Sequence, residues 1–144
     1  MPNARYDRDF YAWTLEQAAL LRAGQLSRAD AENIAEELER LGRAEKRELV
    51  SRLTELLTLL LRARHQPGKR GPDWKNALAS VRGQLLEQLE ENPSLREKMP
   101  EAIASAFRFA RRTLADHATP DDGKIPIACP WPFERMIDGE FWPD

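Results

Sequence analysis

The chain has 144 residues, 32% of them charged, and a formal net charge of −2 at pH 7. A net charge near zero does not favour strong attraction of the whole molecule to nucleic acid or acidic membranes, so any basic site must be local. The only cysteine is Cys129, which excludes an internal disulfide framework and a cysteine-based zinc site. No apolar run approaches the roughly 18 residues that span a bilayer. We therefore expect a soluble, unprocessed cytoplasmic protein with no membrane contact.

Apolar residues at helical spacing predict a first helix that begins near Phe10 and that Gly24 can end. Gln17 interrupts its apolar face near Tyr11 and Trp13. Because an unpaired buried amide costs about 1 to 3 kcal/mol, Gln17 must find hydrogen-bond partners. The candidate roles for these three residues are to line a small pocket or, as we prefer, to anchor the irregular backbone of the C-terminal tail.

The stretch from Ser27 to Gln66 predicts one long helix, with Ser27 and Asp30 resembling a capping box at its start. Its apolar stripe has two runs with one gap, formed by Ile34, Leu38 and Leu41, then Leu49, Leu53, Leu56 and Leu60. A straight helix from Ala29 to Gln66 would be roughly 57 Å long, against a radius of gyration of about 15 Å for a compact domain of this size. The helix therefore breaks near Gly42, or it finds a partner along the exposed part of its stripe. We expect a long helix in which Gly42 is tolerated or slightly bent.

Proline and glycine divide the rest of the chain into further helical blocks. The predicted elements are a loop at 66–72, a third helix from Asp73 to Asn92, a short turn at 94–99, and a fourth helix from Pro100 to His117. Beyond Thr119, prolines alternate with large apolar residues, which predicts a strap laid across the bundle with a short helix at 132–137. The predicted fold is an all-α bundle of four principal helices, including one long helix, in a single domain over 1–144. The Pro- and aromatic-rich C-terminal strap covers about 119–144.

Three groups of segments resemble one known family. They are Asp9-Phe10-Tyr11-Ala12-Trp13 with Glu16-Gln17-Ala18 and Leu20-Leu21-Arg22; Asn33-Ile34-Ala35-Glu36-Glu37-Leu38-Glu39; and Pro93-Ser94-Leu95 with Cys129-Pro130 and Phe141-Trp142-Pro143. In this order they resemble domain-of-unknown-function family twenty-nine, from about Tyr6 to Pro143. The chain departs from the family pattern at Leu59, where a histidine is common, and at Ala63, where a tryptophan is common. The resemblance implies a helical fold and a bacterial source, and it brings no established activity or catalytic residue.

Acidic residues on the long helix offer one candidate metal site. They are Glu32, Glu36, Glu37 and Glu39. Carboxylates three and four residues apart share a helix face and suit magnesium, as a carboxylate-metal enzyme would require. However, each of Glu36, Glu39 and Glu48 has an arginine four residues later, in the favourable orientation. We therefore prefer a solvated, salt-bridged face, and predict no metal and no cofactor.

The segment around the loop offers one basic patch. Its candidate anion- or nucleic-acid-binding residues are Arg62, Arg64, His65, Lys69, Arg70 and Lys75. The five arginines and lysines among them could bind a phosphate backbone, with a log–log salt slope of roughly −4 if all engage. The alternative is a loop that its charges keep soluble, which the negative net charge favours.

No catalytic motif accompanies these patterns: serine-hydrolase signatures and Gly-rich phosphate loops are absent. The leading prediction is a non-enzymatic cytoplasmic interaction module that acts through the long leucine-rich helix, as a homodimer or with one protein partner. Its basis is the length of that helix and the extra apolar residues Val50, Leu57 and Leu61 beside the stripe. The alternatives are a nucleic-acid-binding regulatory protein that uses the basic segment 62–75, and a carboxylate-metal enzyme.

Overall fold

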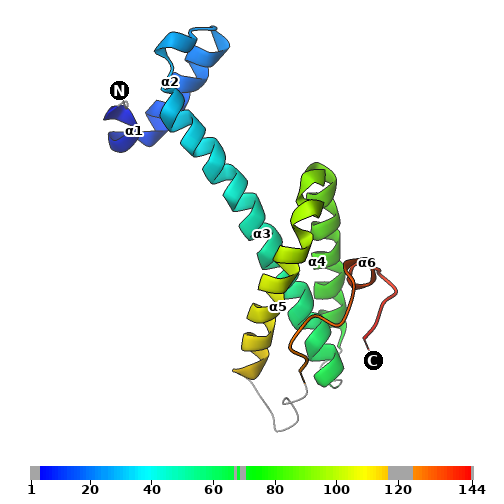
Figure 1. Cartoon of the computed structure of the whole chain (residues 1–144). Coiled ribbons are helices and arrows are strands. Elements are labelled where there is room, and N and C mark those ends of the chain that lie inside the picture. The colour runs from blue at the N-terminus through cyan, green and yellow to red at the C-terminus, as the bar shows by residue number, and fades with distance from the viewer. Residues whose placement is uncertain (1–3, 67, 69–70, 117–124, 144) are drawn as a thin grey trace. The chain divides into compact units, whose positions relative to one another are not determined.

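The computed structural model describes residues 4–66, 68, 71–116 and 125–143 (Figure 1). The α-helices are α1 (Ala4–Arg8), α2 (Phe10–Arg22), α3 (Ala31–His65), α4 (Pro72–Glu91), α5 (Met99–Ala115) and α6 (Phe133–Met136). Short 3-10 helices are η1 (Leu26–Arg28) and η3 (Pro93–Lys98). No strand occurs in the described ranges, and the predicted all-α bundle with one long helix is confirmed.

Contacts within the chain group its residues into two compact units, Met1–Glu45 and Lys46–Asp144. We call them the N-terminal unit and the C-terminal unit. Helix α3 contributes its first part to one unit and its remaining part to the other. Each unit is described by itself, and the single-domain expectation stays a prediction.

In the N-terminal unit, α2 begins and ends as predicted. The Asp9 carboxylate accepts a hydrogen bond from the Ala12 N–H at 3.1 Å, which caps the start of the helix. Gly24 follows the end of α2 with φ of +73°, a left-handed conformation that glycine adopts without strain. The short helix α1, which packs against α2, was not predicted.

The predicted capping box at the start of α3 is wrong. Ser27 lies within η1, and α3 begins at Ala31. The Asp30 carbonyl oxygen accepts the first helical hydrogen bond, from the Ile34 N–H at 2.9 Å. The expected continuity of α3 is confirmed, because the helix runs through Gly42 without a break. No atom lies within 4 Å of the position of a Cβ on Gly42, so no close packing requires a glycine there.

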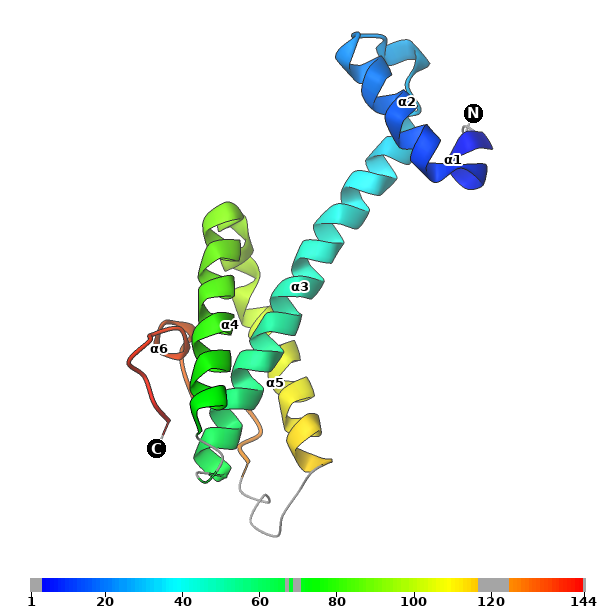
Figure 2. The same ribbon diagram turned by 180° about the vertical axis from the view of Figure 1, so that it is seen from behind.

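In the C-terminal unit, the second part of α3 lies beside α4 and α5, as both Figure 1 and Figure 2 show. The fully buried leucines of α3 are Leu49, Leu53, Leu56, Leu57, Leu60 and Leu61. They form one apolar core with Phe107 of α5 and with five residues of α4, Trp74, Leu78, Val81, Leu85 and Leu89. Leu57 and Leu61 are therefore part of this core, which corrects their interpretation as surplus apolar residues available to a partner. Helices α4 and α5 both pack against α3, and together they bury a wider arc of its surface than a single apolar stripe would occupy.

The described part of the C-terminal strap, residues 125–143, packs on this core as predicted, whereas residues 119–124 and 144 lie outside the described ranges. Phe133 and Met136 of α6 are buried in it, and α6 lies within the range expected for a short helix. Arg82 of α4, also buried, donates hydrogen bonds from Nε to the Met136 carbonyl at 2.8 Å and from Nη2 to the Phe141 carbonyl at 2.9 Å. Burial lowers the pKa of the Arg82 guanidinium, and the charge of Asp138 partly opposes this effect. An arginine of the bundle thus fastens the strap.

Candidate functional site

The centre of the N-terminal unit is a small polar network around Asp30. The Asp30 carboxylate accepts hydrogen bonds from Trp13 Nε1 at 3.0 Å and from Asn33 Nδ2 at 2.8 Å. The Asp30 N–H donates to Gln17 Oε1 at 2.7 Å. All four residues are buried. The network therefore joins α2 to the start of α3 through hydrogen bonds.

The candidate residues Tyr11, Trp13 and Gln17 do not all belong to this network. Trp13 and Gln17 belong to the network, whereas Tyr11 is 73% exposed. Gln17 serves as an anchor, but for the backbone of Asp30 rather than for the C-terminal tail that the sequence suggested. Its Nε2 is buried without a hydrogen-bond partner among the described residues. Sequence reasoning missed Asp30 as the centre, although its position before a helix favours such a role.

Aromatic side chains extend this network toward α1. The ring of Trp13 contacts Tyr6, with centroids 4.8 Å apart, and Phe10, with centroids 5.6 Å apart. The Tyr6 hydroxyl donates a short hydrogen bond to the Glu37 carboxylate of α3. That hydrogen bond raises the pKa of Tyr6, and burial and the nearby glutamate charge act in the same direction. These contacts hold α1, α2 and the first turns of α3 together.

The apolar stripe of α3 is uncovered in the N-terminal unit. Leu38 and Leu41 are 63% and 64% exposed, although they continue the pattern whose later members are fully buried. Ile34, one turn earlier, is half-buried. We call Ile34, Leu38 and Leu41 the open stripe. This is the exposed part of the stripe that an unbroken helix was expected to leave, and α1 contacts α3 on the neighbouring face that carries Glu37.

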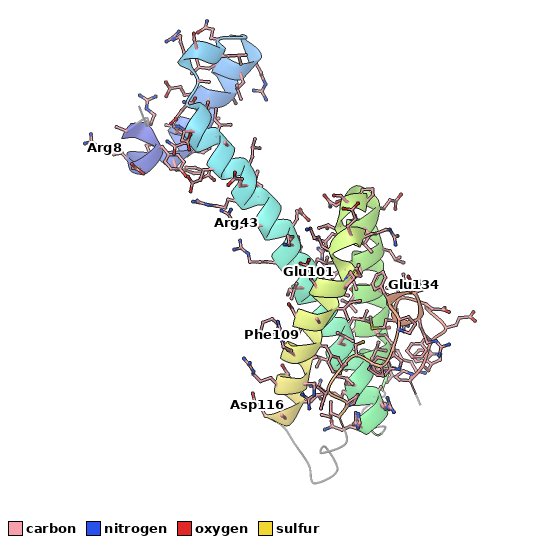
Figure 3. All side chains as sticks on the ribbon, viewed as in Figure 1. Arg8, Arg43, Glu101, Phe109, Asp116 and Glu134 are labelled. Carbon is pink, nitrogen blue, oxygen red and sulfur yellow. The ribbon has the colours of Figure 1, made fainter. Side chains whose placement is uncertain are left out.

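A groove between α3 and α5 lies within the C-terminal unit. It has a volume of about 590 Å³. Its lining residues are Lys46, Arg47, Val50, Ser51, Thr54, Ser105 and Phe109. Phe109 projects from α5 and is 46% exposed (Figure 3). We call this feature the α3–α5 groove. No sequence pattern predicted it, because its two walls are more than fifty residues apart in the chain.

The basic candidates are only partly placed. Lys69 and Arg70 lie outside the described residues. Arg62, Arg64 and His65 form the last turn of α3, where Arg64 is exposed and the other two are half-buried. Lys75 of α4 sits over the ring of Trp142, with Nζ 5.7 Å from the centroid. Lys75 therefore contacts the strap. That the basic residues together form a nucleic-acid-binding surface stays a prediction.

The acidic face of α3 is salt-bridged in part as expected. Arg52 pairs with Glu48 at 2.6 Å and Arg43 with Glu39 at 3.9 Å, whereas Arg40 pairs with Glu37 at 3.2 Å instead of Glu36. Within the described ranges, no three side chains of the metal-binding types come together. The carboxylate-metal hypothesis therefore gains no geometric support from the described residues.

Cys129 is the remaining candidate residue. Its Sγ donates a hydrogen bond to the Trp131 carbonyl at 3.4 Å. Burial raises the pKa of the Cys129 thiol, and this hydrogen bond partly opposes that effect. A raised pKa disfavours the nucleophilic thiolate. None of the described helices combines the length and apolar character needed to cross a membrane.

Comparison with known proteins identifies the family. A family model described as a domain of unknown function, DUF29, matches residues 5–142. The match covers nearly the whole chain, so the chain belongs to the DUF29 family. No curated protein and no solved structure matches it. The family assignment brings no activity, and function has to be argued from the surfaces described above.

Proposed function

We propose that this member of the DUF29 family is a non-enzymatic protein-interaction module of the bacterial cytoplasm, and that the open stripe is its docking surface. The partner is a second copy of the chain or one other protein. One observation carries the proposal: among its described residues, the N-terminal unit buries one apolar side chain, Trp13, and exposes seven large ones. Those seven are Phe10, Tyr11, Leu15, Leu21, Leu26, Leu38 and Leu41.

The energetic argument follows from this contrast. Fixing the backbone of one residue costs about 1 to 2 kcal/mol, while burying one large apolar side chain contributes about 1.5 to 3 kcal/mol. A unit of this size with one buried apolar side chain gains little from burial, and its polar network adds only modest net stability. Small folded units commonly need a further source of stability such as association. A partner that covers Leu38 and Leu41 would supply it.

The other candidate functions lack an observation of this kind. The basic segment 62–75 includes residues outside the described part of the chain, and the acidic face is engaged in ion pairs. Both hypotheses remain alternatives, and nucleic-acid binding is addressed by the same experiment as the main proposal.

The test compares Leu38→Asp with Leu86→Asp, a matched change at an exposed leucine of α4. Sedimentation velocity measures self-association, and capture of the tagged protein from its host, with and without nuclease, measures other partners. We expect Leu38→Asp to abolish the association and Leu86→Asp to preserve it. A protein that stays monomeric at high concentration and captures no other protein contradicts the proposal. Nuclease-sensitive capture would instead favour the basic segment.

A further inference from the structure

The open stripe and the α3–α5 groove both present apolar side chains, and the charges beside them are of opposite sign. We propose that the open stripe of one copy of this chain docks in the α3–α5 groove of a second copy. This inference rests on the proposed function, because it names the partner of the open stripe. It also assigns a role to the groove, which the proposed function leaves unused.

The groove offers an apolar floor with a positive edge. Val50 and Phe109 are the large apolar side chains in its lining, and Lys46 and Arg47 are its charged ones. An adjoining hollow shares Lys46 and Val50 and adds Lys98 and Glu101, so cations still outnumber acids there. An exposed phenylalanine beside two cations suits an amphipathic helix that carries aliphatic and acidic side chains.

The open stripe has that composition. Its three aliphatic side chains stand on a helix that, from Ala31 to Glu45, contains five glutamates and two arginines. Glu45 is four residues beyond Leu41 and extends the line of the stripe, while Glu39 lies next to Leu38. Residues three and four apart share a helix face, so carboxylate charge lies beside the apolar side chains.

The two surfaces also match in length. The open stripe, from Ile34 to Leu41, covers seven residue steps, or roughly 10 Å along the helix axis. The α3 wall of the groove, from Lys46 to Thr54, covers eight steps, or roughly 12 Å. The groove is therefore long enough to receive the three side chains of the stripe, and the net negative charge of the segment 31–45 suits the cations Lys46 and Arg47 of the groove.

Charge favours this arrangement over contact between two open stripes. Pairing stripe with stripe brings together two segments, 31–45, that each carry five glutamates and two arginines, and like charges in an interface oppose association. Docking in the groove replaces those contacts with pairs of opposite charge. Each copy carries one stripe and one groove, so reciprocal docking closes a dimer and one-way docking builds a chain of copies.

Charge exchange provides the first test. One variant carries Lys46→Glu and Arg47→Glu in the groove, and the other carries Glu39→Lys and Glu45→Lys beside the stripe. Each variant alone should associate about tenfold more weakly or worse, which corresponds to the loss of about 1.4 kcal/mol. An equimolar mixture should recover association, because each stripe then meets a groove of opposite charge. Weakened association that the mixture does not restore overturns the inference.

Site-directed cross-linking provides the second test, in a Cys129→Ala background whose folding is checked by circular dichroism. A copy with Leu38→Cys is mixed with a differently tagged copy with Ser51→Cys and oxidised mildly. We expect the mixed disulfide to be the main product. The matched controls are Leu26→Cys and Ser80→Cys, exposed residues of the same types that belong neither to the open stripe nor to the lining of the groove, which should give little product.

The outcomes separate this inference from the proposed function. If Leu38→Cys copies link mainly to one another, the docking mode is wrong while the open stripe remains an interaction surface. If the chain is monomeric but Leu38→Asp abolishes capture of another protein, the second copy is the wrong partner and the proposed function stands. If Leu38→Asp changes neither measurement, both are wrong.

Discussion

The two units of this chain are held together by different physical means. The C-terminal unit has a continuous apolar core contributed by α3, α4, α5 and the strap. The N-terminal unit instead has a polar network around Asp30 and an aromatic cluster around Trp13. Non-directional burial gives a unit stability of its own, whereas a few hydrogen bonds mainly fix geometry. This difference supports the proposal that the C-terminal unit is the scaffold and that the N-terminal unit presents the docking surface.

The largest expected effect comes from making the same leucine-to-alanine substitution in each of the two units. Leu56 is fully buried and Leu38 is 63% exposed on the same helix. Leu56→Ala should lower the free energy of unfolding by about 2 to 5 kcal/mol, because it leaves a cavity. Leu38→Ala should change it by no more than about 0.5 kcal/mol in the dissociated protein. Urea denaturation at low protein concentration measures both, and equal losses would contradict the comparison.

An intermediate effect is expected from the polar network. Asp30→Ala removes the acceptor for Trp13 and Asn33, and should cost the N-terminal unit about 1 to 3 kcal/mol. Asp30→Asn retains an acceptor oxygen and should cost less. Amide hydrogen exchange should show faster exchange in α2 and the first turns of α3, with the core helices α4 and α5 unchanged. Equal loss of protection in α4 would show that the two units unfold together.

The smallest expected effect is a pH dependence confined to the N-terminal unit. The hydrogen bond to Glu37 raises the pKa of Tyr6 above its ordinary value of about 10. The neutral phenol is therefore favoured in the folded unit, and its contribution is fully present below about pH 10. It is lost as the pH rises through the higher pKa of the folded state.

Absorbance titration of the tyrosinate should show this late ionisation, and Tyr6→Phe should remove both it and the associated alkaline loss of protection in α1. The Tyr11→Phe variant is the matched control, because Tyr11 is exposed and lies outside the network. If Tyr6→Phe left the alkaline behaviour unchanged, the contact with Glu37 would have no role in holding α1.

Local pattern was sufficient for most of the fold. Apolar residues at steps of three and four defined α2, α3, α4 and α5, and proline and glycine marked where they end. The continuity of α3 through Gly42 also followed, because one glycine costs a helix only about 1 kcal/mol against alanine. The start of α3 was misplaced, since η1 takes up Ser27 and the network selects Asp30 as the first acceptor.

Whether the open stripe is exposed and where the α3–α5 groove forms both depended on tertiary contacts. Leu38 and Leu56 occupy the same apolar pattern, yet only the second is covered, because coverage depends on where α4 and α5 pack. Leu57 and Leu61 were expected beside the stripe and are in the core for the same reason. The α3–α5 groove needs residues from two distant helices, which no local pattern connects.

By itself, the sequence determined the four principal helices of this protein, their approximate bounds, and the chemical character of each of their faces. These are properties of neighbouring residues, which share a face through the 3.6-residue period of the helix. Only the tertiary structure decided which apolar faces are buried, which partner satisfies Gln17, and that Arg82 holds the strap. These outcomes depend on contacts between residues far apart in the chain, and the free energy of those contacts is set by packing rather than by local pattern.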